Sequence, residues 1–139
     1  KTFAPFLEKT TVFNVAVGNE DGEIMFSEDS LDGKVSDGSG TNAQKTAIRK
    51  IDTLMEDKRI TYLKADIEGF EQEMLKGAQQ TIINNKPKIA ITTYHDQNDA
   101  QEIISLIKSY VPEYKYYVKG IYEMAPKPVM IHFMLMIFS

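Results

Sequence analysis

The sequence contains no cysteine and no tryptophan, and its basic residues are fewer than its acidic ones. Without cysteine the chain has no disulfide framework, no thiolate nucleophile and no zinc site built on cysteine, so we expect a cytoplasmic protein. The 16 lysines and arginines stand against 20 acidic residues, which gives a net charge of -4. A nucleic-acid-binding domain needs clustered positive charge, so we expect no nucleic-acid partner.

Long hydrophobic runs are also missing. The apolar stretch at residues 129–138 has ten residues, which is well below the ~20 that a helix needs to span a bilayer. The first residues lack the charged, apolar and small-residue regions of a signal peptide. We therefore expect no membrane partner, and we interpret residues 129–138 as a buried strand.

The length of 139 residues fits a single domain with a hydrophobic core. The first residue is a lysine rather than a methionine, so we expect the chain to be a piece of a longer protein. Residues 28–42 are rich in Ser, Asp and Gly and poor in apolar residues, which predicts a loop.

The hydrophobic pattern predicts an α/β fold with a mixed sheet flanked by helices. The first two strands, at residues 11–17 and 23–27, surround a turn and are expected to pair as a hairpin. Strands that alternate with helices in the middle of the chain require parallel crossovers. The further strands are expected at residues 45–51, 60–65, 88–94, 114–118 and 129–138.

Two helices are expected between the later strands. Phe70, Met74, Ala78 and Ile82 recur at four-residue spacing, which predicts one amphipathic helix that ends before Pro87. A second helix is expected to begin at a cap formed by Asp99 and to continue to Tyr110. Asp52 is expected to cap a short turn at residues 53–56.

The strand at residues 60–65 is followed by two carboxylates, Asp66 and Glu68, and by Gly69, just before a helix. His95 follows the next strand along the chain. The carboxyl ends of parallel strands meet at one edge of a sheet, where ligands of open α/β sheets bind. The pattern therefore favours an enzyme with Asp66 and His95 in one crevice.

Residues 51–95 resemble the FkbM-type methyltransferases. In that family a strand ends in K-x-D-x-E-G-x-E, a helix carries L-K-G-A, and the next strand follows K-P and ends in histidine. The same motifs stand here at Lys64 to Glu71, Leu75 to Ala78, Lys86-Pro87 and His95. Upstream, the segment Asn14 to Asn19 is similar to the family's strand and turn.

The resemblance implies a partial Rossmann-like class I fold that uses S-adenosylmethionine to methylate a hydroxyl of a sugar or related small metabolite. It also implies cofactor contacts from Ala16, Val17 and Asp66. The family's glycine-rich cofactor loop should precede residue 11, where only ten residues stand. We therefore expect the domain at residues 1–139 to lack that loop. Gly38-Ser39-Gly40 is a weak substitute, because no apolar strand precedes it.

Methyl transfer to a hydroxyl needs a group that takes up the proton, and His95 is our candidate base. Asp66 or Glu68 could orient the imidazole, contact the cofactor or carry a divalent ion, and we assign no metal ligand at this stage. Glu71 can be interpreted as a charge that favours the helix N-terminus.

Two other functions stay open. The chain could be a catalytically silent binding or oligomerising module, because the strand at residues 11–17 would lack a neighbour and expose an edge. A homo-oligomer would cover such an edge. The third reading is a metal-dependent hydrolase that uses Asp66, Glu68 and His95, although one histidine and two acids are a thin set of ligands.

Overall fold

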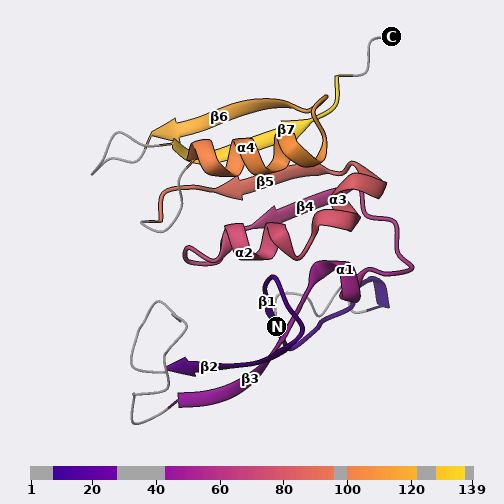
Figure 1. Ribbon diagram of the computed structural model, residues 1–139, viewed down its shortest axis with the longest axis vertical. Coiled ribbons are helices and arrows are strands. Elements are labelled where there is room, and N and C mark those ends of the chain that lie inside the picture. Colours follow the sequence, from indigo (N-terminus) through magenta and orange to yellow (C-terminus); the bar gives the residue numbers. More distant parts are fainter. Residues whose placement is uncertain (1–7, 28–42, 96–99, 122–127, 137–139) are drawn as a thin grey trace.

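The computed structural model describes residues 8–27, 43–95, 100–121 and 128–136. Its strands form a three-stranded sheet in the order β1-β3-β2 and a four-stranded sheet in the order β4-β5-β7-β6 (Figure 1). The predicted α/β class with a mixed sheet is confirmed. The strands are β1 (Ala16–Val17), β2 (Gly22–Ser27), β3 (Ala43–Arg49), β4 (Tyr62–Ala65), β5 (Lys88–Thr92), β6 (Lys115–Ile121) and β7 (Pro128–Met134). The helices are α1 (Ile51–Leu54), α2 (Glu71–Lys76), α3 (Gln79–Asn85) and α4 (Ala100–Tyr110).

The four-stranded sheet combines one parallel pair with two antiparallel pairs. β4 and β5 run parallel, with Tyr62 opposite Lys88 and Ala65 opposite Ile91. β7 lies between β5 and β6 and is antiparallel to both. The predicted parallel crossover through the helices after Phe70 is therefore confirmed, and it places the carboxyl ends of β4 and β5 at the same edge.

The main core lies between this sheet and the helices. Every second side chain of β5 and of β7 faces the helices, because successive side chains of a strand point to opposite faces of the sheet. These side chains pack against fully buried side chains of α2, α3 and α4. The sheet contributes Ile89, Ile91, Ile131 and Phe133, and the helices contribute Met74, Leu75, Ile82, Ile103 and Ile107. No helix in the part of the chain that the structure describes is long and apolar enough to cross a membrane.

The expected hairpin of the first two strands is wrong. β1 has only two residues and pairs in parallel with β3, and β2 pairs antiparallel with the other side of β3. Asp21 in the turn between β1 and β2 accepts hydrogen bonds from the backbone of Lys50 (2.9 Å) and the hydroxyl of Thr53 (2.7 Å). These contacts tie the turn to α1 and favour β3 as the common partner. The early strand therefore has a neighbour on one side.

The expected helix from Phe70 to the residues before Pro87 is broken into α2 and α3 at Gly77 and Ala78. A Cβ atom at Gly77 would lie 1.9 Å from the carbonyl oxygen of Gly18, so only glycine allows this approach. The carbonyl of Gly77 also accepts a hydrogen bond from the backbone of Asp52 (2.9 Å). Apolar spacing gives no sign of the break, because the stripe continues through it.

Asp52 caps a different helix from the one expected. It lies in the first turn of α1, and its carboxylate accepts hydrogen bonds from the backbone of Gln80 (3.0 Å) and Thr81 (2.8 Å). These are early N–H groups of α3, which lack partners within the helix. The carboxylate thus joins α1 to the start of α3. The expected cap at Asp99, the Gly38–Gly40 segment and the loop at residues 28–42 lie outside the described residues.

The contact between Gly77 and Gly18 gives a direct test of how the two sheets are joined. We expect Gly77→Ala to lower the free energy of unfolding by at least the ~1–3 kcal/mol typical of overpacking, because the obstructing atom belongs to the backbone. Urea denaturation measures this change.

Gly22→Ala is the matched control. A Cβ at Gly22 would lie 3.9 Å from the nearest side-chain atom of Ile48, an ordinary contact distance. We expect this variant to keep the stability of the parent chain. Equal stability of the Gly77 and Gly22 variants would contradict the proposed contact.

Tyr114 gives a pH-dependent test of the core. Its side chain is fully buried, and its hydroxyl donates a hydrogen bond to the carbonyl of Pro87. Burial raises the pKa of Tyr114 from 10.0 to about 12. The neutral phenol therefore contributes stability that is complete below pH 10 and is lost as the pH rises to about 12. We expect Tyr114→Phe to reduce the slope of unfolding free energy against pH in this range. Identical slopes in denaturation series would contradict the assignment.

Candidate functional site

The site lies at the shared carboxyl edge of β4 and β5. Asp66 directly follows β4, and His95 lies three residues beyond the end of β5. Because the two strands are parallel neighbours, the chain leaves both at the same edge. This is the edge at which open α/β sheets bind ligands.

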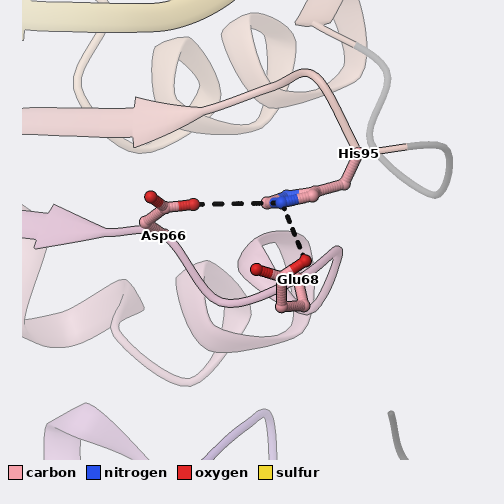
Figure 2. Close-up of side chains that lie close together, drawn as sticks. All are labelled: Asp66, Glu68 and His95. Atoms are coloured by element: carbon pink, nitrogen blue, oxygen red, sulfur yellow. Dashed lines mark ion pairs between the residues drawn. The ribbon is translucent and has the colours of Figure 1, made fainter. Parts of the chain in front are cut away.

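A tight turn brings Glu68 back toward this edge. Glu68 has φ 54° and Gly69 has φ 94°, so two successive residues adopt the left-handed conformation before α2 begins. For a residue with a side chain this conformation costs on the order of 1–3 kcal/mol, and such residues concentrate at functional sites. Figure 2 shows the Glu68 side chain below the imidazole of His95 and Asp66 beside it.

The imidazole of His95 faces both carboxylates. Its Nε2 atom lies 3.2 Å from Oε2 of Glu68 and 3.9 Å from Oδ1 of Asp66 (Figure 2). The side chain of His95 is 8% exposed, whereas those of Asp66 and Glu68 are 41% and 51% exposed. One nitrogen of a buried ring is therefore presented to two carboxylates that solvent and ligands can reach.

Glu71 holds the opposite side of the imidazole. Its Oε1 atom lies 3.3 Å from Nδ1 of His95, and its side chain is fully buried. The same oxygen accepts hydrogen bonds from the backbone of Ile67 (2.9 Å) and the hydroxyl of Thr92 (2.8 Å). Oε1 of Glu71 is thus held beside Nδ1, and Nε2, on the other side of the ring, faces Asp66 and Glu68.

Tyr94 adds a hydroxyl to the site. Its OH donates a hydrogen bond to Oδ1 of Asp66 (3.3 Å), and its ring lies against that of His95, with centroids 4.1 Å apart. Burial and the neighbouring carboxylates of Asp66 and Glu68 raise the pKa of Tyr94 above 10.0. Tyr94 therefore stays a hydrogen-bond donor at neutral pH.

The structure brings together three of the residues predicted for the site. Asp66, Glu68 and His95 form one cluster whose candidate ligand atoms all lie within 4.8 Å of one another. Ala16 and Val17, the predicted cofactor contacts, lie in β1 of the three-stranded sheet. Their contact with a cofactor and the base role of His95 stay predictions.

Sequence reasoning underestimated Glu71. Its place at the start of a helix is explained by the helix dipole alone, so nothing in the charge pattern requires burial. One signal was present, because side chains on a helix point toward its N-terminus. A carboxylate in the first turn therefore points back toward the strand end that precedes the helix, where Asp66 lies.

Comparisons with known proteins agree with this architecture. A family model described as the methyltransferase FkbM domain matches residues 3–117. The structure is also similar to the crystal structure of methyltransferase FkbM from Methylobacillus flagellatus KT, with a TM-score of 0.69 and 26% sequence identity. That match covers 95% of this chain and 30% of the other chain, so this chain spans about 30% of its solved relative. No curated protein matched the sequence.

The matched segment contains β4 and β5 with the site at their shared edge, including Asp66, Glu68, Glu71 and His95. It extends over most of the sequence, and the solved relative shares the arrangement of the chain in space. The chain therefore belongs to the FkbM methyltransferase family.

Proposed function

We propose that the protein transfers a methyl group from S-adenosylmethionine to a hydroxyl of a sugar or related small metabolite. The observation that carries the proposal is the cluster of Asp66, Glu68 and His95 at the shared edge of β4 and β5, within a chain of the FkbM methyltransferase family. Family membership favours this reaction over the metal-dependent hydrolase that the same residues would allow.

S-adenosylmethionine, when bound, supplies an activated methyl group on a sulfonium. The acceptor's hydroxyl oxygen forms the new bond to carbon, the bond from sulfur to carbon breaks, and its electron pair stays on sulfur. The hydroxyl proton must also leave, and this is the part of the reaction that side chains can assist. A hydroxyl is a weak nucleophile until that proton is removed or drawn away.

The cluster can assist proton loss in two ways. Nε2 of His95, held toward Asp66 and Glu68 by the contact of Glu71 with Nδ1, can accept the proton directly. Alternatively, the same nitrogen and the two carboxylates can hold a cation that makes the hydroxyl more acidic. In both cases His95 acts on the acceptor rather than on the methyl donor.

Asp66 is the described residue best placed to hold the donor. Its carboxylate lies at the strand end and is 41% exposed, and the negative charge there fits the positive charges of the sulfonium and ammonium groups. The described residues contain no G-x-G turn that opens a helix. We therefore propose Asp66 as one part of the donor site.

The experiment that tests the function measures release of S-adenosylhomocysteine by the natural protein that carries this chain. The acceptors are a panel of sugars and other polyhydroxylated metabolites, each compared with its deoxy analogue. We expect turnover with at least one member, and loss of turnover when the methylated hydroxyl is absent. Absence of donor binding together with a stable dimer would instead support the silent module. The expected cytoplasmic location and possible homo-oligomer stay part of the proposal.

His95→Ala is the variant that tests the role of the cluster. We expect turnover to fall by ~10²- to 10⁴-fold, the range for loss of a positioned proton acceptor, while donor affinity stays nearly unchanged. Asp66→Asn should weaken both turnover and donor binding, because that carboxylate is assigned to the donor. Steady-state kinetics and calorimetry separate these two effects.

Glu113→Gln is the control for removal of a surface charge. Glu113 forms an exposed ion pair with Lys86 (3.2 Å) after α4 and takes no part in the cluster. Its replacement should leave turnover unchanged. Full turnover by His95→Ala with a true acceptor would remove the histidine from the mechanism and leave Asp66 or Glu68 as the proton acceptor.

A further inference from the structure

We propose that Asp66, Glu68 and His95 bind one divalent cation of the Mn²⁺ type. Ligand atoms about 2.1 Å from a metal and at right angles to each other lie about 3 Å apart. Nε2 of His95 lies 3.2 Å from Oε2 of Glu68 and 3.9 Å from Oδ1 of Asp66. The two carboxylates are half-exposed and can rotate, so small side-chain movements would close these distances around an ion.

The state of His95 is the independent observation that points to a ligand. The side chain is more than nine-tenths buried, and its Nε2 atom is directed at the two carboxylates. Neither ring nitrogen makes a hydrogen bond of acceptable geometry, although both are shielded from solvent. Buried polar atoms are nearly always satisfied, so a nitrogen in this position fits a bond to a metal.

Charge at the site favours a cation as well. Asp66 and Glu68 are directed at the same nitrogen, and among the described residues His95 is the one basic side chain within ion-pair distance of either. Carboxylates that share a site repel each other unless a positive charge lies between them. A divalent ion would supply that charge and would take one oxygen from each carboxylate, and the second oxygen of Asp66 would stay available to the donor.

Glu71 completes the arrangement that metal-binding histidines commonly have. Such a histidine usually presents its second ring nitrogen to a carboxylate, which fixes the tautomer and strengthens the bond to the metal. Oε1 of Glu71 lies 3.3 Å from Nδ1 of His95 and is itself held by Ile67 and Thr92. The buried carboxylate therefore orients the imidazole for coordination through Nε2.

The ligand set selects the class of ion. Two carboxylate oxygens and one imidazole nitrogen suit Mn²⁺, whereas sites for Mg²⁺ and Ca²⁺ are usually built from oxygen alone and tetrahedral zinc sites take more nitrogen or sulfur. Three protein ligands leave positions open for water or a substrate oxygen. The site is thus an open one.

The use of the ion rests on the proposed function. The acceptor's hydroxyl oxygen would occupy an open position, and its proton would pass to solvent as the oxygen takes up the methyl group. His95 then serves as a ligand, and the positive charge of the ion draws the proton away.

Titration of the 139-residue chain with Mn²⁺, followed by the electron paramagnetic resonance signal of the free ion, tests the site. We expect one bound ion per chain. His95→Ala and Glu68→Gln should each weaken binding at least tenfold, and Glu71→Gln should weaken it by ~10- to 100-fold, the range for loss of a carboxylate behind a ligand. Circular dichroism checks that each variant is folded. We expect Glu68→Gln to disturb folding least, because the side chain of Glu68 is half-exposed.

The matched controls remove the same chemical groups elsewhere. Glu113→Gln removes an exposed carboxylate, and His132→Gln removes a histidine on β7. Both should bind Mn²⁺ like the parent chain. Absence of saturable binding, or binding that survives in His95→Ala and Glu68→Gln, would overturn the inference.

The inference and the proposed function can fail separately. Methyl transfer that continues in the presence of a strong chelator, by protein that binds no Mn²⁺, would overturn the metal site and leave the proposed function standing. Stoichiometric Mn²⁺ binding that depends on Glu68 and His95, without methyl transfer to any acceptor, would support the metal site and count against the function.

Discussion

The buried carboxylate of Glu71 is the contact on which the site depends. One of its oxygens accepts hydrogen bonds from the backbone of Ile67 and the hydroxyl of Thr92 and lies beside Nδ1 of His95. Burial of a charge is costly unless hydrogen bonds replace its hydration, and here the backbone of Ile67 and the hydroxyl of Thr92 supply them. Glu71 thereby fixes the turn after β4 against the end of β5. The orientation of His95 toward Asp66 and Glu68 follows from that arrangement.

Polar and backbone contacts join the two sheets, in addition to the packing of Val17 and Ile51 against the main core. Gly77 lies against the carbonyl of Gly18, and Asp52 caps α3 from α1. Because α2 and α3 are separated at Gly77, the chain can approach the three-stranded sheet at that point while α2 keeps Glu71 under the site. The break in the helix therefore allows the contact with the three-stranded sheet at Gly77, and it also keeps Glu71 beside His95.

The sequence predicted the parts of the fold that depend on hydrophobic periodicity. The strands after residue 43, the helix at residues 100–110 and the parallel arrangement of the strands that precede Asp66 and His95 follow from apolar runs and from the crossover rule. Clustering of Asp66 and His95 followed in turn, because parallel neighbours end at one edge. The resemblance to the FkbM family, based on motifs between Lys64 and His95, was confirmed by the family match.

Other features depend on contacts between distant residues, which local patterns do not contain. β1 pairs with β3, although β2 lies between them in the sequence. Gln80, whose backbone donates a hydrogen bond to Asp52, lies 28 residues away in the sequence. The break at Gly77 reflects an approach by Gly18 that no helical pattern shows, and the burial of Glu71 depends on Thr92. Such contacts form only in the folded chain, so local sequence patterns do not predict them.

The tautomer of His95 tests the central claim most directly, because the account assigns one ring nitrogen to Glu71 and the other to Asp66 and Glu68. Long-range proton–nitrogen NMR correlations of the folded chain distinguish the two neutral forms. The account predicts that the neutral imidazole carries its proton on Nδ1, facing Glu71, with Nε2 unprotonated. A neutral imidazole with its proton on Nε2 would contradict it.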